Sequence, residues 1–420
     1  MKRHKLCVAV LVGLAICYGC MNAVPVYAQN GGIAFSAGPT LFVARMSHAA
    51  FVLPDGRVVL AGGHGTDFVP LASAEIWNPA TSAHTGFTTV STHDNGAVAK
   101  LSDGRYILAG GSSDSLGVGY SVTAEIFDPA NDSFTATGNM HYARTSNSAA
   151  TLSDGRVLTA GCWYNATSAA YGDLFDPTTN TFTATGALNT ARSNPRVLPT
   201  ADGKAVVFGG MGTYGSPYIE QVELYDPDSN SFSILQDNLL PEETGWVTLG
   251  SMGDTNGNLV DAQKLPDGRY LFLAVNTSLS SYALVTFNPA TKAFAKFETS
   301  PPLPSNSAVS LLNPLVDTSH NTVYLLAQDL TQSSGTLPIQ TRVYRINLAT
   351  GVRSDPAGTS PLDGYLGSVG LNLLQDGRLF VSGGNTRTDY YYNFYPTDKT
   401  FLGDLIVSVV RMPPLLLLMQ

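Results

Sequence analysis

Charged and imidazole side chains recur along the first half of the chain, and they include the groups best suited to chemistry. They are Arg45, His48, His93, Asp94, Arg144 and Arg192. Guanidinium groups clamp carboxylates through paired hydrogen bonds, and imidazole groups exchange protons near neutral pH. The same groups also serve as buried partners of other polar groups, because a buried charge must be paired. Two interpretations therefore stay open here, ligand contact and structural pairing.

Aromatic residues accompany these charged groups in irregular segments of the chain. They are Trp163, Tyr164, Tyr214, Tyr218 and Trp246. An aromatic ring offers an apolar face to a ligand together with a polar edge. We count these five residues and the six above as ligand-binding candidates. The sequence predicts no catalytic residue, no metal ligands and no cofactor.

The elements that must position these residues are short apolar runs between turns. In the segment 101–138, a turn at Asp103-Gly104 precedes an apolar run that ends at Gly110-Gly111. An alternating run, 123–127, then leads into a second turn at Asp128-Pro129. Short apolar runs bounded by Gly, Asp and Pro predict strands joined by hairpins.

The same pattern recurs along the chain. The Asp-Gly turn is found at Asp55, Asp103, Asp154, Asp202, Asp267 and Asp376, with a decayed copy near Asn321. The second turn is found at Asn78, Asp128, Asp176, Asp226 and Asn288, with weaker copies at Asn347 and Tyr395. Phased copies about 50 residues apart are typical of a propeller with four strands in each repeat.

An Asp-Gly turn, a strand ending in Gly-Gly and an aromatic-Asp-Pro hairpin resemble the kelch repeat. The resemblance implies an all-β fold over residues 33–401, a seven-bladed kelch-type β-propeller of four-stranded antiparallel blades. Six blades remain an alternative if the sixth repeat has decayed. We expect the N-terminal strand Ile33 to Ala37 to close the ring by pairing with the strand around Tyr392 to Tyr395, which removes an open sheet edge.

Strand alternation places the connections on two faces of such a ring. The Asp-Gly turns and the aromatic-Asp-Pro hairpins share one face, and the longer, variable loops after each Gly-Gly pair share the other. Variable loops on a repetitive scaffold usually carry the binding site. We therefore expect any ligand at the mouth of the central channel on the variable face. The insertion Gln236 to Asn258 enters there with Trp246, which either stacks on a ligand or pins the insertion.

The two ends of the chain differ from the repeats. Lys2, Arg3 and Lys5 precede an apolar run, and Ala28 offers a cleavage site, so residues 1–28 predict a signal peptide and residues 402–420 an irregular tail. A lipoprotein site at Cys20 is the weaker alternative. We predict a secreted, periplasmic or cell-surface protein without a transmembrane anchor after cleavage.

Charge and cysteine content narrow the choice of partners. Removing three leader cations leaves 20 Lys and Arg against 32 Asp and Glu, a net charge of −12. This balance excludes nucleic acid as an expected partner. Cys162 alone remains after cleavage at Ala28, so no internal disulfide is predicted, and we interpret it as a small buried residue in a monomer.

Kelch propellers include enzymes as well as binding modules, so the resemblance leaves the activity open. Galactose oxidase, a copper-radical enzyme, has such a propeller, but Ser47 and Asn95 stand here where its motifs have a tyrosine and a cysteine. That comparison disfavours a copper-radical oxidase. The leading prediction is non-enzymatic binding of a carbohydrate or a protein at the variable face. The alternative is a sugar-active enzyme that resembles the sialic-acid mutarotases.

Overall fold

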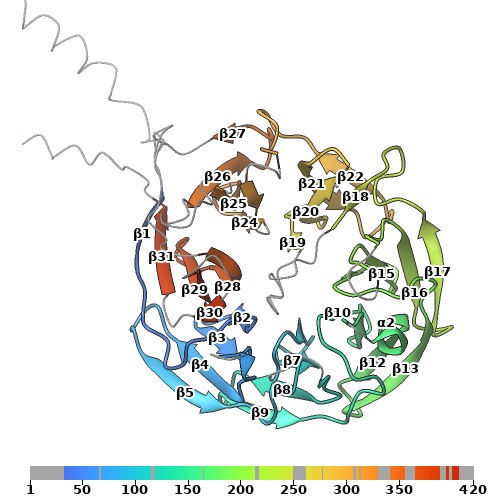
Figure 1. Ribbon diagram of the computed structural model, residues 1–420, viewed down its shortest axis with the longest axis horizontal. Helices are drawn as coiled ribbons and strands as arrows, with labels where there is room; N and C mark the ends of the chain where they lie inside the picture. Colours follow the sequence, from blue (N-terminus) through green and yellow to red (C-terminus); the bar gives the residue numbers. More distant parts are fainter. Residues whose placement is uncertain are drawn as a thin grey trace, which may run out of the picture.

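A computed structural model shows a ring of antiparallel β-sheets, each standing as a blade around a common centre (Figure 1). The all-β propeller expected from the repeats is confirmed. The structure describes residues 33–65, 68–114, 119–163, 165–212, 217–248, 262–276, 278–305, 309–311, 314–329, 341–354, 365–387, 394–396 and 400–405.

The first four blades each contain four consecutive strands, and their order in the sheet leads from the centre of the ring to its rim. The first two blades are β2 (Ala49–Val52), β3 (Val58–Ala61), β4 (Ser73–Trp77) and β5 (His84–Thr88), then β6 (Ala97–Lys100), β7 (Tyr106–Ala109), β8 (Ala124–Asp128) and β9 (Ser133–Ala136). The next two are β10 (Ser148–Thr151), β11 (Val157–Ala160), β12 (Tyr171–Asp176) and β13 (Thr181–Ala187), then β14 (Arg196–Pro199), β15 (Ala205–Phe208), β16 (Val222–Asp226) and β17 (Ser231–Gln236). A short helix, α2 (Ala166–Ala170), precedes β12.

Two further blades of consecutive strands have an inner strand in two parts. The fifth contains β18 (Trp246–Val247), β19 (Gln263–Lys264), β20 (Tyr270–Asn276), β21 (Ser281–Phe287) and β22 (Phe294–Phe297). The sixth contains β23 (Val309–Leu311), β24 (Leu315–Asp317), β25 (Thr322–Asp329), β26 (Thr341–Asn347) and β27 (Arg353–Ser354). β18 and β19 both pair with β20, and β23 and β24 both pair with β25.

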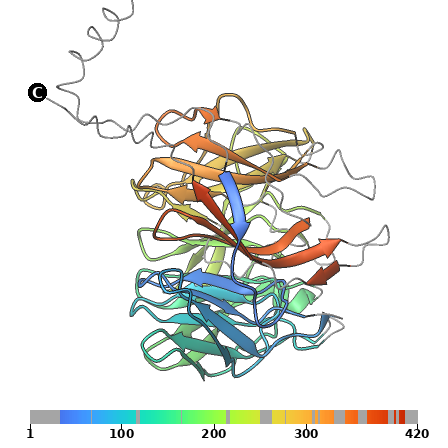
Figure 2. The ribbon, with the colours of Figure 1, turned by 90° about the vertical axis from the view of Figure 1, so that its left-hand side faces the viewer.

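The remaining sheet joins the two ends of the chain and closes the ring. Its order is β28 (Tyr365–Leu373), β29 (Leu379–Arg387), β31 (Thr400–Leu405) and β1 (Ile33–Ala37). Figure 2 shows β1 beside β31, with Ala37 opposite Phe401 and Ile33 opposite Leu405. Closure by an N-terminal outer strand is confirmed, but the expected partner strand around Tyr392 to Tyr395 is wrong.

The seven-bladed propeller expected from the repeats is wrong in its number of blades. Six blades consist of consecutive strands, whereas the seventh repeat departs from the pattern. Its expected hairpin at Tyr395 is instead part of β30 (Phe394–Pro396), which pairs with the end of β29 beyond the part that pairs with β31. β28 pairs with the other edge of β29 at both places, so β30 and β31 are two parts of the third strand of this sheet. β31 also runs four residues beyond the boundary placed at Phe401.

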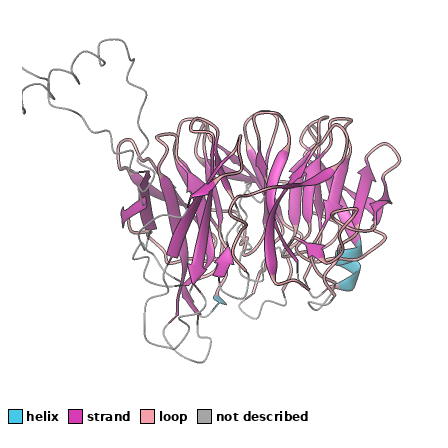
Figure 3. Cartoon of the chain, turned by 90° about the horizontal axis from the view of Figure 1, so that it is seen from above, coloured by secondary structure: helices cyan, strands magenta, loops and turns pink. Residues whose placement is uncertain are grey.

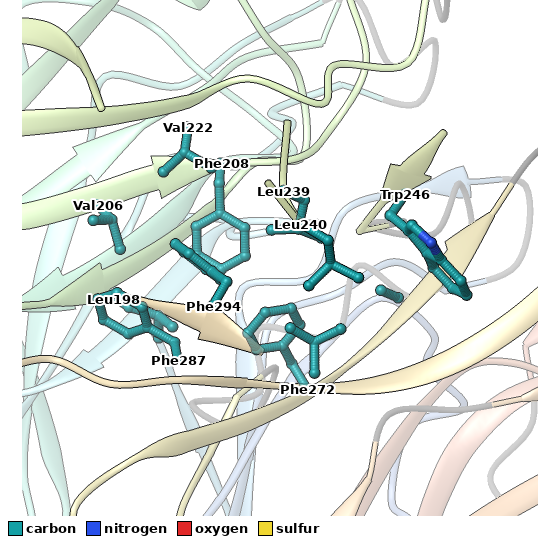
Figure 4. Close-up of a cluster of buried hydrophobic side chains, with 12 residues drawn as sticks. Leu198, Val206, Phe208, Val222, Leu239, Leu240, Trp246, Phe272, Phe287 and Phe294 are labelled. Carbon is teal, nitrogen blue, oxygen red and sulfur yellow. The ribbon is translucent and has the colours of Figure 1, made fainter. Parts of the chain in front are cut away.

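Apolar side chains fill the spaces between neighbouring blades. Figure 4 shows the cluster between the fourth and fifth blades, where Phe208 packs near Phe272 and Phe294. Trp77 stacks on Phe380 between the first blade and the closing sheet. Burying a side chain of this size contributes about 1.5–3 kcal/mol, so these interfaces hold the ring together.

The two faces of the ring carry different connections (Figure 3). Arg57, beside the first Asp-Gly turn, donates to Asp132 and to the carbonyl of Pro129 in the aromatic-Asp-Pro hairpin of the next blade. Ala201 similarly donates to Pro289. These contacts confirm that both kinds of short turn share one face, which leaves the other face to the variable loops.

Trp246 belongs to the fifth blade and not to a free insertion. It starts the inner strand β18, is buried, and donates from Nε1 to Glu243 over 2.8 Å. Lys296 lies 4.5 Å from its ring centre. These contacts hold Trp246 within the blade. Residues 249–261 of the expected insertion lie outside the described residues.

Substitution of glycine should reveal the close approach at the Gly-Gly pairs. Gly110 has φ +75°, and a Cβ there would lie 2.6 Å from the carbonyl oxygen of Arg144. Gly104 has φ +92° with nothing within 4 Å, so it reports backbone strain alone. We expect Gly104→Ala to cost about 1 kcal/mol and Gly110→Ala about 2 kcal/mol more, measured by urea unfolding. Equal costs would mean that the close approach to Arg144 is relieved without penalty.

Candidate functional site

Three of the predicted arginines form buried ion pairs with the third strand of their own blade. Arg45 pairs with Glu75, Arg144 with Asp173 and Arg192 with Glu223, each with an N–O distance of 2.7 Å. The three arginine side chains are 0% exposed. The structure therefore places these guanidinium groups inside the blades, where carboxylates of the protein bind them.

Each of these arginines also donates to the carbonyl of the glycine that ends the second strand. The acceptors are Gly62, Gly161 and Gly209, always 17 residues after the arginine. The second blade has His93 in this place, whose Nδ1 donates to Gly110 O, again 17 residues on, and whose Nε2 lies 2.7 Å from Glu125. We call these four groups, each a cation or imidazole with its carboxylate and glycine carbonyl, the blade clamps.

The clamp carboxylates also hold the chain that enters each blade. Glu75 accepts from the backbone N–H groups of Phe42 and Val43. Asp173 accepts from His141 and Tyr142, and Glu223 from Asn189 and Thr190. A carboxylate that accepts several such bonds fixes the path of the link before the inner strand. Sequence reasoning missed these acids, although each stands in the third-strand run just before the aromatic turn.

The aromatic candidates do not gather into one cluster. Trp163 follows Cys162 and donates from its backbone to Thr145 O, while Trp246 is buried between blades. Tyr218 is 44% exposed. Tyr164 and Tyr214 lie outside the described residues. Cys162 is buried, and burial raises the pKa of its thiol, which fits the interpretation as a small core residue.

The groups left for chemistry centre on a histidine that the sequence analysis did not select. His64 follows the Gly62-Gly63 pair of the first blade, and its Nδ1 donates to Asp94 Oδ1 over 2.7 Å. Its ring is buried, and Nε2 has no hydrogen-bond partner among the described residues. With Nδ1 protonated, Nε2 is an acceptor. The repeat signal gave no reason to single out His64, because the other blades have no histidine there.

The chain path around His64 brings together residues distant in sequence. In the first blade, Met46 and His64 exchange backbone hydrogen bonds. In the second blade, Asp94 forms a β-bridge with Ser112. A Cβ at Gly63 would lie 2.4 Å from Met46 O, so only glycine permits this approach. The neighbouring links are joined as well, because Asn95 donates to Ser47 O and Ser146 donates to Asn95 O. We call His64 with Asp94 the His64 site.

His48 is a second imidazole beside this site, in the link before β2. It is fully buried, and its Nε2 lies 3.1 Å from Ser382 Oγ in the closing sheet. Burial, with Arg45 and His64 nearby, lowers the pKa of His48 to about 3. His48 therefore remains neutral throughout the physiological range.

The donor set does not fit a metal centre within the described part of the chain. There, no group of three or more His, Cys, Asp or Glu side chains lies close enough together to hold a metal ion. Copper in proteins is bound by imidazole nitrogens, often together with Cys or Met sulfur. At this site the imidazole of His64 is bonded to Asp94 and that of His48 to Ser382. We derive no step through a metal. The described helices also include none that is long and apolar enough to span a membrane.

Removing the cation of a blade clamp should destabilise the fold strongly. In Arg144→Met, the buried carboxylate of Asp173 loses its counter-charge, which costs about 3–5 kcal/mol. The matched control is Arg105→Met, because Arg105 pairs with Asp103 at the surface and such pairs contribute about 0–1 kcal/mol. Urea unfolding measures both. Similar small losses in both variants would contradict the structural role of the clamps.

The low pKa of His48 predicts a pH-dependent contribution to stability. Unfolding restores the pKa of His48 to its ordinary value of 6.5. Between about pH 6.5 and pH 3, His48 is therefore protonated in the unfolded chain and neutral in the folded chain. Stability should therefore fall with decreasing pH, by up to ~1.4 kcal/mol per pH unit from this group. We expect the cost of His48→Asn to shrink from pH 7 to pH 4 in urea unfolding. A cost independent of pH would contradict a buried neutral imidazole.

Comparison with known proteins identifies the fold. No family model matches the chain, and no curated protein matches its sequence. Among solved structures, the chain is similar to a fungal alcohol oxidase of the AA5 family in complex with copper. The TM-score is 0.56 at 14% sequence identity, over 90% of this chain and 76% of the oxidase. At this identity the likeness shows the propeller fold alone.

This comparison corrects the functional prediction. Non-enzymatic binding of a carbohydrate or protein was the leading interpretation, with a mutarotase-like enzyme as the alternative and a copper-radical oxidase disfavoured. A solved structure of similar fold is an alcohol oxidase in complex with copper. The prediction of non-enzymatic binding is therefore wrong. The comparison shows a β-propeller fold for this chain.

Proposed function

We propose that this chain is a kelch-type propeller enzyme whose His64 removes the proton from the hydroxyl group of a small alcohol. The observation that carries the proposal is the state of the His64 ring. One nitrogen is fixed by a carboxylate at 2.7 Å, and the other is buried and unpartnered within the described structure. Other buried nitrogens, such as His48 Nδ1, also lack a partner within the described structure, but His64 is distinguished by the carboxylate that holds its second ring nitrogen.

The pairing with Asp94 suits His64 to act as a general base. The carboxylate holds the tautomer in which Nε2 accepts, and it stabilises the imidazolium that forms when Nε2 takes a proton. The imidazole is shielded from bulk water. In this buried environment its interaction with a charged partner is stronger than it would be at the surface. A general base positioned in this way accelerates the catalysed reaction by a factor of about 10²–10⁴.

The substrate class follows from the acceptor and from the fold comparison. An unpaired imidazole nitrogen calls for a hydrogen-bond donor, and a hydroxyl group is a donor that can also lose its proton. The solved enzyme of similar fold is an alcohol oxidase, which supports an alcohol as the class to test first. In our proposal, this chain's own residues perform the proton transfer, with His64 as the base and Asp94 as the positioning residue.

The kelch assignment and export complete the proposal. Asp-Gly turns and aromatic-Asp-Pro or aromatic-Asn-Pro hairpins recur in phase through the first five blades, which supports kelch-type repeats in particular. The basic and apolar residues before Ala28 support a cleaved signal and a location outside the cytoplasm, although this segment lies outside the described residues. The ligand would then reach the enzyme in the periplasm or at the cell surface.

The proposal is tested by the turnover of a panel of small alcohols with oxygen as the oxidant, followed by NMR of the carbonyl product. In this reaction His64 takes the hydroxyl proton, and the two electrons and the hydrogen lost from the alcohol carbon pass to oxygen, which leaves as hydrogen peroxide. We expect Asp94→Asn to lower turnover by about 10²–10⁴, because the amide no longer holds the accepting tautomer or stabilises the imidazolium. His64→Gln should lower it at least as far. Asp103→Asn, at an exposed turn on the opposite face, is the matched control and should retain full activity.

Either of two results would overturn the proposal. One is a wild-type protein that converts no alcohol in the panel. The other is an Asp94→Asn variant that turns over substrate at the wild-type rate, since Asp94 would then have no part in the reaction.

A further inference from the structure

The loop that follows His64 carries an exposed aromatic residue in an unfavourable backbone conformation. Phe68 has φ +57°, in the left-handed region that residues with a large side chain avoid. Its side chain is nevertheless 51% exposed, and that of Val69 is 50% exposed. Burial therefore does not account for a phenylalanine at this position. Strained residues of this kind cluster at sites of function.

Backbone hydrogen bonds hold this conformation next to His64. Gly65 donates to Val69 O over 2.9 Å, and Leu71 donates to Gly63 O over 2.8 Å. The loop is thereby closed on both sides of Phe68. The centres of the Phe68 and His64 rings are 5.2 Å apart, with 35° between their planes. An exposed apolar surface thus lies directly against the proposed base.

We propose that Phe68 and Val69 select alcohols in which an apolar group, in particular an aromatic ring, is attached to the carbon that bears the hydroxyl. This inference rests on the proposed function of His64 and adds its substrate class. The apolar group packs against Phe68 while the hydroxyl donates to His64 Nε2. Aromatic rings prefer offset or edge-to-face contacts at 4.5–7 Å, and the half-exposed Phe68 side chain is accessible for such a contact. A polyol would instead place hydroxyl groups against this surface without hydrogen-bond partners.

The same blade provides a matched control for Phe68. Phe42 is 60% exposed, and its ring is stacked on that of His84, with 4.4 Å between the ring centres. His84, however, lies 3.0 Å from the clamp carboxylate of Glu75, so it belongs to the structural pairs. Phe42 with His84 therefore repeats the aromatic–imidazole contact without a free base.

The experiment measures binding of benzyl alcohol and glycerol to the full chain through the NMR signals of its histidine side chains. We expect benzyl alcohol to shift the His64 signals. We also expect it to bind about threefold to tenfold more tightly than glycerol, which is the range of affinity that one aromatic contact supports. The His84 signals should not move. Phe42→Ala should leave both affinities unchanged.

Phe68→Gly separates selectivity from folding. Glycine adopts a positive φ freely, so the variant should melt no lower than the wild type, yet it should lose the preference for benzyl alcohol. Equal affinity for the two alcohols in the wild type, or an unchanged preference in Phe68→Gly, overturns the role of Phe68. In those cases the role of His64 as a base is still tested separately, by the turnover of the Asp94→Asn variant. No shift of the His64 signals with either alcohol overturns both proposals.

Discussion

The buried pairing of a cation or imidazole with a third-strand carboxylate is the interaction on which the rest of this propeller depends. Each clamp connects three parts of a blade: the link before the inner strand, the glycine that ends the second strand and the acid of the third strand. Two charges buried alone would each cost several kcal/mol, so neither partner can be lost singly. The clamps fix the chain at the ends of the inner strands, where the loops of the variable face begin.

The clamps also separate structural groups from reactive ones. Arg45, Arg144 and Arg192 are held by carboxylates and glycine carbonyls, so their guanidinium groups are committed to the fold. His64 has a carboxylate partner too, but that partner comes from the neighbouring blade and leaves one ring nitrogen free within the described structure. The proposed base thus lies where the repeat pattern is broken, and Phe68 adds an apolar surface at the same place.

The sequence predicted the regular blades well because their turns depend on local residues. Asp103-Gly104 and Asp128-Pro129 dictate turns whatever surrounds them, and the strands between follow. Closure was only partly predictable, since Tyr395 imitates the hairpin signal but lies in β30, on the edge of β29 that β31 also pairs with. The role of Arg144 was undecidable locally, because its partner Asp173 lies 29 residues away. His64 was missed because its significance depends on Asp94, a contact that no spacing rule announces.

The most direct test of this account is a crystal structure of the chain with a small alcohol bound. The account predicts the alcohol oxygen within about 2.6–3.2 Å of His64 Nε2, with Asp94 still on Nδ1 and the clamp arginines still on their carboxylates. An alcohol bound among the clamp arginines or on the face of the Asp-Gly turns, with Nε2 bonded to a protein atom, would contradict it.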